Sequence, residues 1–108
     1  MPDAREQVAA RFRGLPVREV CGLRIPMAAT PGSRLLGLAH LDRDAAGPGL
    51  FIPRCRCVHT FGMRFALDLV FLGDASQPVS VRHHVPPRRI AVERRARAVL
   101  ELPASPAA

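Results

Sequence analysis

Short apolar runs alternate with turns rich in proline and glycine along most of the chain. Apolar or alternating runs of four to eight residues between such turns are typical of β-strands. The pattern predicts a hairpin between residues 15 and 27 that turns near 21–22, and strands over 50–52, 65–72, 79–85 and 97–103. Eleven prolines and eight glycines agree with a mainly β fold with many turns.

One segment carries the signal for a helix start. Thr30 can cap free backbone N–H groups, and Pro31 suits the first helical position, where its missing donor costs nothing. We expect one short α-helix over about residues 31–41, with Leu35, Leu38 and Ala39 facing the core. Arg34 lies one turn before Leu38, so its stem can point inward.

The length of 108 residues fits one domain that is large enough for a single core. Residues 1–13 are charged and predict a flexible or short helical arm. Residues 14–103 predict a single β-rich domain. The Pro/Ala-rich residues 104–108 predict a loose tail.

The amino-acid composition indicates which cellular location and which binding partners to expect. All 16 cations are arginine, and the net charge is +7, which can attract nucleic acid or other anions. Three cysteines make a disulfide framework improbable. The first residues lack the layout of a secretory signal, and no apolar run reaches the roughly 20 residues of a membrane helix. We expect a cytoplasmic monomer without a membrane segment.

Asp68 is the first candidate for chemistry, because it is the one acid inside the apolar strand over 65–72. A carboxylate in such a strand is costly unless something neutralises it, which predicts a buried charged site. Its partner would be Arg34, or Arg64 if the chain bends near Gly62. The alternative is a purely structural carboxylate that accepts backbone N–H bonds.

Three further residues are candidates for the same site. His59 titrates near neutral pH and can act as an acid, a base or a ligand contact. It stands beside Thr60, in a turn-prone segment where a backbone can approach a ligand. Glu101 lies between two leucines of the last strand, where it either faces solvent or forms a second acid near Asp68.

A metal site is a weak candidate. Cys55, Cys57 and His59 would share one face of an extended strand. Structural zinc sites, however, usually have C-x₂₋₄-C spacing and a fourth ligand. We expect no metal and no cofactor.

The order of motifs resembles a known family. The motifs are Arg34…Gly37-Leu38, then His59-Thr60-x-Gly62-Met63-Arg64-x-x-Leu67-Asp68-x-x-Phe71-Leu72, then Val99-Leu100-Glu101-Leu102. Between Ile25 and Ala104 they resemble the domain-of-unknown-function family 192, also called uncharacterised protein family 0127.

The resemblance implies a compact β-sandwich or barrel-like domain with one short helix. It implies no activity, substrate or cofactor. The motif residues of the family fall on Arg34, Gly37, His59, Asp68 and Glu101. Many members carry Trp-Met-Lys-Asn where this chain has residues 59–62, so chemistry that depends on that Lys or Asn does not transfer.

Four hypotheses follow. The leading one is a binding module in which a polar cleft holds a small anionic or polyhydroxyl ligand, with contacts from Arg34, His59, Thr60, Arg64, Asp68 and Glu101. The second is an enzyme with His59 as acid or base, oriented by Asp68. The third is a basic accessory protein that contacts nucleic acid or an acidic partner through Arg82, Arg88, Arg89, Arg94, Arg95 and Arg97. The fourth is that the charged residues only stabilise the fold.

Nucleic acid is the less favoured partner, because the chain offers few aromatic residues for base stacking.

Overall fold

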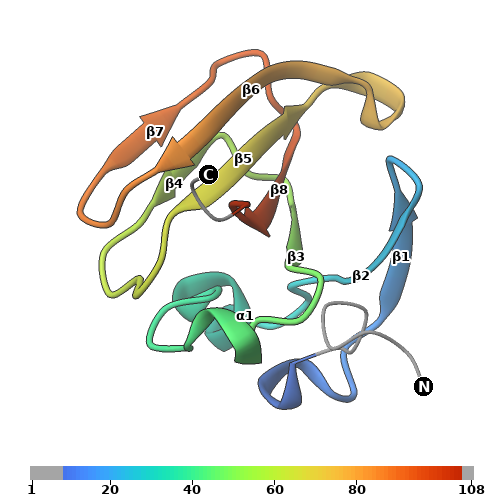
Figure 1. Ribbon diagram of the computed structural model, residues 1–108. Helices are drawn as coiled ribbons and strands as arrows, with labels where there is room; N and C mark the ends of the chain where they lie inside the picture. The colour runs from blue at the N-terminus through green and yellow to red at the C-terminus, as the bar shows by residue number, and fades with distance from the viewer. Residues whose placement is uncertain (1–8, 106–108) are drawn as a thin grey trace.

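The strands of this protein pair into one central sheet and two small ones (Figure 1). The computed structural model describes residues 9–105. Its strands are β1 (Val17–Val20), β2 (Leu23–Pro26), β3 (Leu50–Pro53), β4 (Cys57–His59), β5 (Leu67–Leu72), β6 (Pro78–Val85), β7 (Ile90–Val92) and β8 (Ala98–Pro103). Its helices are α1 (Pro31–Leu36) and the short 3₁₀ turns Ala10–Phe12, Arg43–Ala45 and Asp74–Ser76. The predicted mainly β fold with one short α-helix is confirmed.

The central sheet has four antiparallel strands in the order β3-β8-β5-β6. The register of β5 against β8 places Leu69 opposite Glu101 and Asp68 opposite Leu102. Successive side chains of a strand point to opposite faces of a sheet. Glu101 and Asp68, one on each of two adjacent strands, therefore point to different faces.

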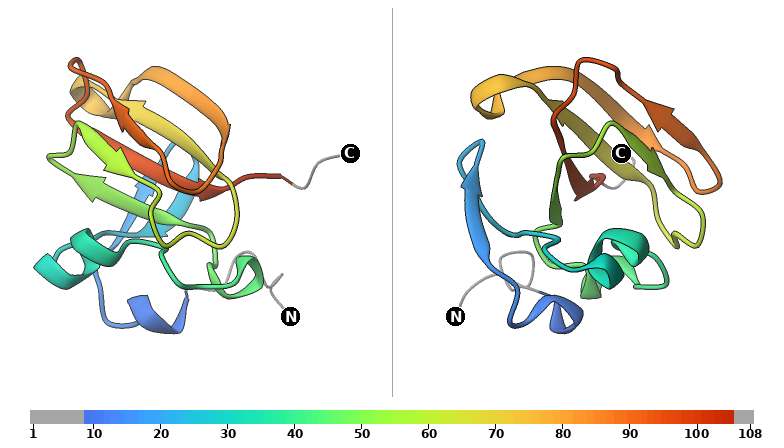
Figure 2. Two further views of the ribbon diagram at one scale, coloured as in Figure 1. Left: turned by 90° about the vertical axis from the view of Figure 1, so that its left-hand side faces the viewer. Right: turned by 180° about the vertical axis from the view of Figure 1, so that it is seen from behind.

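The two faces pack against different elements. On one face, Leu69 and Phe71 belong to a core cluster with Phe12 and Val58. On the other face, Leu72 and Leu100 pack with residues of the β1–β2 hairpin, Val20 and Ile25. The hairpin lies at the right of Figure 1, and β4 and β7 lie at the left. Figure 2 shows α1 below β4 and β7.

Helix α1 is shorter than the predicted span of residues 31–41. Thr30 caps it as predicted, and Thr30 and Ser33 form a reciprocal capping box. The helix ends at Leu36, because Gly37 adopts φ 52° and ψ −129°, which is outside the helical region. Leu38 and Ala39 are buried as predicted, but Leu35 is 72% exposed. The prediction for Leu35 is wrong because the chain leaves the helix before that side chain can share a face with Leu38.

Strands β4 and β7 were missed. They pair with each other in an antiparallel two-stranded sheet, and Ala91 of β7 is buried. The segment around β7 reads as an arginine-rich loop because three apolar residues between charged neighbours are too few to show an alternation. The predicted hairpin and the strands β3, β5, β6 and β8 are confirmed.

Residues just outside the predicted span 14–103 pack against the domain at both ends. Phe12 is 1% exposed and belongs to the core, so part of the predicted arm over residues 1–13 is packed. Ala104 is also buried, and its N–H donates to the carbonyl of Ala66. Residues 1–8 of the arm and 106–108 of the tail lie outside the described part of the chain. Between residues 9 and 105 no helix is long and apolar enough to cross a membrane.

Candidate functional site

A pocket of about 450 Å³ opens between α1, the loop after it, the segment around β4, and β8. Exposed side chains of Leu35, Leu36 and Phe61 line it, and Glu101 is its buried acid. Because β8 is paired on both sides, by β3 and by β5, the acid sits on a central strand of the sheet. This is a rigid support for a binding group.

Glu101 is the most unusual side chain of the pocket. It is 4% exposed, and its Oε1 has no hydrogen-bond partner among residues 9–105. The carboxyl accepts a hydrogen bond from the backbone N–H of Leu38, which favours the charged form. Burial opposes this more strongly and raises the pKa of Glu101 to about 7. The pocket therefore contains an acid that titrates near neutral pH and has a free oxygen.

Gly37 lets the loop approach this acid closely. A Cβ at position 37 would lie 2.8 Å from Oε1 of Glu101, and the positive φ of Gly37 also disfavours a side chain. Arg11 also holds this loop in place, because its Nη1 donates to the carbonyls of Gly37 (3.2 Å) and Ala39 (2.6 Å). The pocket loop is thus fixed by a residue from the predicted arm.

Arg34 lines the pocket, but it does not pair with Asp68 as predicted. Its Nη1 donates to the carbonyl of Pro53, and its Nη2 donates to the carbonyl of Arg54 at 3.1 Å. These two bonds tie α1 to the end of β3. Two of the five N–H donors of the guanidinium are therefore used inside the fold.

Cys55, Cys57 and His59 all line the pocket without forming a metal site. The Cys55 thiol donates to the carbonyl of Cys57 at 3.3 Å, and burial raises its pKa, so it favours the neutral thiol. Cys57 and His59 are exposed on β4, and the ring of His59 lies 5.8 Å from that of Phe61. In the described part of the chain, no three His, Cys, Asp or Glu side chains come together as metal ligands would.

Asp68 has a structural partner on the opposite face of the sheet. Its Oδ1 accepts the backbone N–H of His84 at 3.0 Å and lies 3.5 Å from Nδ1 of His83. At this point β6 has a bulge, in which the two histidines stand opposite Asp68 alone. The side chain of Asp68 is 21% exposed, so the predicted buried charge is only partly buried at this position.

No hydrogen bond or ion pair joins His59 to Asp68 among residues 9–105. His59 lines the pocket from β4, whereas Asp68 contacts His83 and His84 of β6, so the described contacts do not include the one that the enzyme hypothesis expects. The purely structural interpretation describes the contacts of Asp68 better.

Thr60 and Arg64 also serve the fold outside the pocket. Thr60 is 1% exposed; its Oγ1 donates to the carbonyl of Pro86 at 2.7 Å and accepts the N–H of Arg89 at 2.8 Å. Arg64 forms an exposed ion pair with Asp42 at 3.0 Å.

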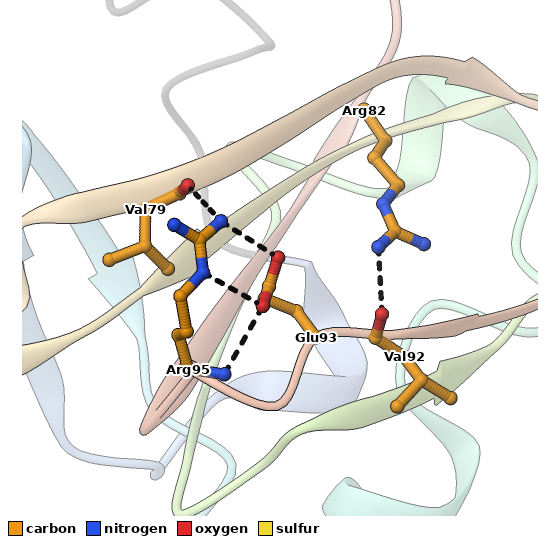
Figure 3. Close-up of polar contacts among 5 residues, drawn as sticks. All are labelled: Val79, Arg82, Val92, Glu93 and Arg95. Atoms are coloured by element: carbon orange, nitrogen blue, oxygen red, sulfur yellow. Dashed lines mark hydrogen bonds and ion pairs between the residues drawn. The ribbon is translucent and has the colours of Figure 1, made fainter.

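Several arginines of the proposed basic surface make contacts within the protein. Arg95 binds Glu93 and the carbonyl of Val79, and Arg82 donates to the carbonyl of Val92 (Figure 3). The hydrogen bonds from Arg95 hold the pKa of Glu93 below its usual value. Arg97 pairs with Asp74 at 2.6 Å. These contacts join β6 and the turn before it to β7 and the segment after it. They leave fewer arginines free to bind a polyanion.

Comparison with known families identifies the chain. The model of family DUF192, described as "Uncharacterized ACR, COG1430", matches residues 9–108. This chain belongs to the DUF192 family. The resemblance seen in the motifs is thereby confirmed.

A crystal structure of a protein of unknown function from Novosphingobium aromaticivorans has a similar fold. The TM-score is 0.63 at 17% sequence identity, and the match covers 96% of this chain and 87% of that chain. At this identity the likeness shows the fold alone. No curated protein matches the chain.

The DUF192 fold brings together only part of the predicted site. Arg34, His59 and Glu101 meet at the pocket, whereas Thr60, Arg64 and Asp68 are placed elsewhere. Residues that the sequence did not single out for the site are Arg11, Leu35, Leu36 and Phe61. The motifs Gly37-Leu38 and Val99-Leu100-Glu101-Leu102 contain the two sides of the contact between the loop and the acid. They gave no signal for the apolar rim.

Proposed function

We propose that this DUF192 domain is a binding module whose pocket holds a small ligand through a hydroxyl group that donates to Glu101. The observation that carries the proposal is the free Oε1 of a buried carboxylate that lines a pocket. A buried acceptor without a partner costs about 1–3 kcal/mol, and a ligand donor at this oxygen would recover that cost. The volume of about 450 Å³ suits a small molecule.

A hydroxyl group is favoured over the other two classes of head group. An anion would face the carboxylate of Glu101, while Arg34, the arginine that lines the pocket, already donates to two carbonyls. A cationic ligand would approach Arg34 and a chain with a net charge of +7. A neutral hydroxyl avoids both repulsions, so the anionic half of the original ligand hypothesis has less support.

The test is an amide NMR titration of the full chain with four probes, namely acetate, inorganic phosphate, glucose and 1-butanol. We expect saturable shifts at residues 37–39 with a hydroxyl-bearing probe. At pH 8, where most of the carboxyl is charged, Glu101→Gln should weaken that binding about tenfold or more, because a charge-assisted hydrogen bond is lost. Asp68→Asn is the matched control, because it changes an acid on the other face of the sheet. Binding that is unchanged in Glu101→Gln, or the absence of shifts at this loop with every probe, would refute the proposal.

A cytoplasmic location and a monomeric state are part of the same proposal. Three cysteines that are free thiols support a reducing compartment. Cell fractionation and light scattering of the purified protein test the two statements.

A further inference from the structure

The rim of the pocket is apolar and exposed. Leu35 is 72% exposed, Phe61 50% and Leu36 44%. Single exposed apolar side chains are ordinary on a protein surface. These three, however, line one pocket together. Such a concentration is typical of a surface that is covered when a ligand is present.

The inner wall is also apolar. Leu38, Ile52, Val58 and Met63 line it, and each is buried. Among the polar groups, Arg34 and the Cys55 thiol already donate to backbone carbonyls. A ligand with many hydroxyl groups would leave most of them without partners against this wall, which is costly. The pocket therefore suits one hydroxyl group and an apolar body.

The apolar surface continues outward from the pocket along the small sheet. His59 and Cys57 line the pocket, and they pair across the strands with Ile90 and Val92. Ile90 is 65% exposed and Val92 50%. A ligand longer than the pocket thus meets further apolar surface where it leaves the mouth.

We infer that the ligand is amphipathic, with an apolar body that lies between Leu35 and Phe61 and a terminal hydroxyl group at Glu101. This inference rests on the proposed function, because it takes the contact with Glu101 as given. It adds the chemical class of the ligand, namely a long-chain alcohol or a molecule that ends in one, in place of a polyol.

The experiment measures the affinity of the full chain for 1-butanol, 1-hexanol and 1-octanol by NMR titration, with glycerol and glucose as polyol probes. Each added methylene should raise the affinity about fourfold, as expected when the chain is buried. The polyols should not bind. The substitutions Leu35→Ser and Phe61→Ser should lower the affinity for 1-octanol more than the affinity for 1-butanol. Val17→Ser is the matched control, because Val17 is an apolar side chain on β1 that is 47% exposed, close to the 50% of Phe61.

The outcomes separate this inference from the proposed function. If the affinity does not change with chain length, or if only the polyols bind and Glu101→Gln abolishes their binding, the amphipathic ligand is refuted while the binding role of Glu101 stands. If alcohols bind equally well to Glu101→Gln, or if no probe binds, the proposed function fails and the inference fails with it.

Discussion

Two acids lie on adjacent strands of one sheet and have opposite environments. Asp68 on β5 is partly exposed and accepts a backbone N–H from the bulge of β6. Glu101 on β8 is buried and keeps one oxygen without a partner among the described residues. The first acid completes the hydrogen bonding of an irregular strand. The second leaves hydrogen-bonding capacity unused inside a pocket, which a fold does not need for its own stability. The difference is the reason why the proposed binding function is placed on the face of the sheet that carries Glu101.

The largest difference between the two acids is expected in the pH dependence of the free energy of unfolding. A carboxyl whose pKa is raised on folding from 4.5 to about 7 stabilises the fold in its protonated form. This contribution to the free energy of unfolding is fully present below pH 4.5. It falls by about 3 kcal/mol as the pH rises to 7. Glu101→Gln should remove this loss and be more stable than the natural chain at pH 8. Urea unfolding at pH 4.5 and pH 8 measures the effect.

Asp68→Asn should keep the pH profile of the natural chain between those two values. A profile of Glu101→Gln that runs parallel to the natural one would show that Glu101 is solvated like an ordinary acid.

Gly37→Ala tests how tightly the loop is fitted to the pocket acid. The added Cβ would meet Oε1 of Glu101, and the backbone conformation is one that glycine adopts most readily. We expect a loss of about 2 kcal/mol in urea unfolding. Gly32→Ala in α1 is the control, because no atom lies within 4 Å of its Cβ. If Gly37→Ala left the free energy of unfolding unchanged, the loop and the acid would be able to move apart easily.

Asp68→Ala tests the structural role of the other acid. It removes the acceptor of the His84 N–H, and the protein should lose about 1 kcal/mol of stability. Binding of alcohols at the pocket should be unchanged. A loss of binding with the fold intact would return Asp68 to the functional site.

The smallest effect is expected for Arg64→Ala. The ion pair with Asp42 is exposed on both sides, so its removal should leave the midpoint of urea unfolding and the affinity for alcohols unchanged within error. A clear fall in affinity would show that the pocket extends to Arg64.

Short apolar runs between turns were sufficient to predict the strands of the central sheet, because strands such as β3 and β8 bury side chains on both of its faces. They were not sufficient to choose between the two acids. Asp68 and Glu101 both stand among apolar neighbours in a strand. Which of them points into the pocket depends on the register of β5 against β8 and on the bulge in β6, and neither property is local in sequence. The rim was missed for a similar reason, since Leu35 becomes exposed only because Gly37 ends the helix early.

The parts of the pocket also differ in how freely they can change during evolution. Glu101 belongs to a strand that is hydrogen-bonded on both sides, so a shift of its backbone would disturb three strands at once. Leu35 and Leu36 stand on a helix of six residues, and Phe61 stands in a turn. Substitutions there alter exposed side chains and leave the sheet intact. Under the proposed function, substitutions at the rim change the apolar body that the pocket accepts and leave the anchor for its polar end in place.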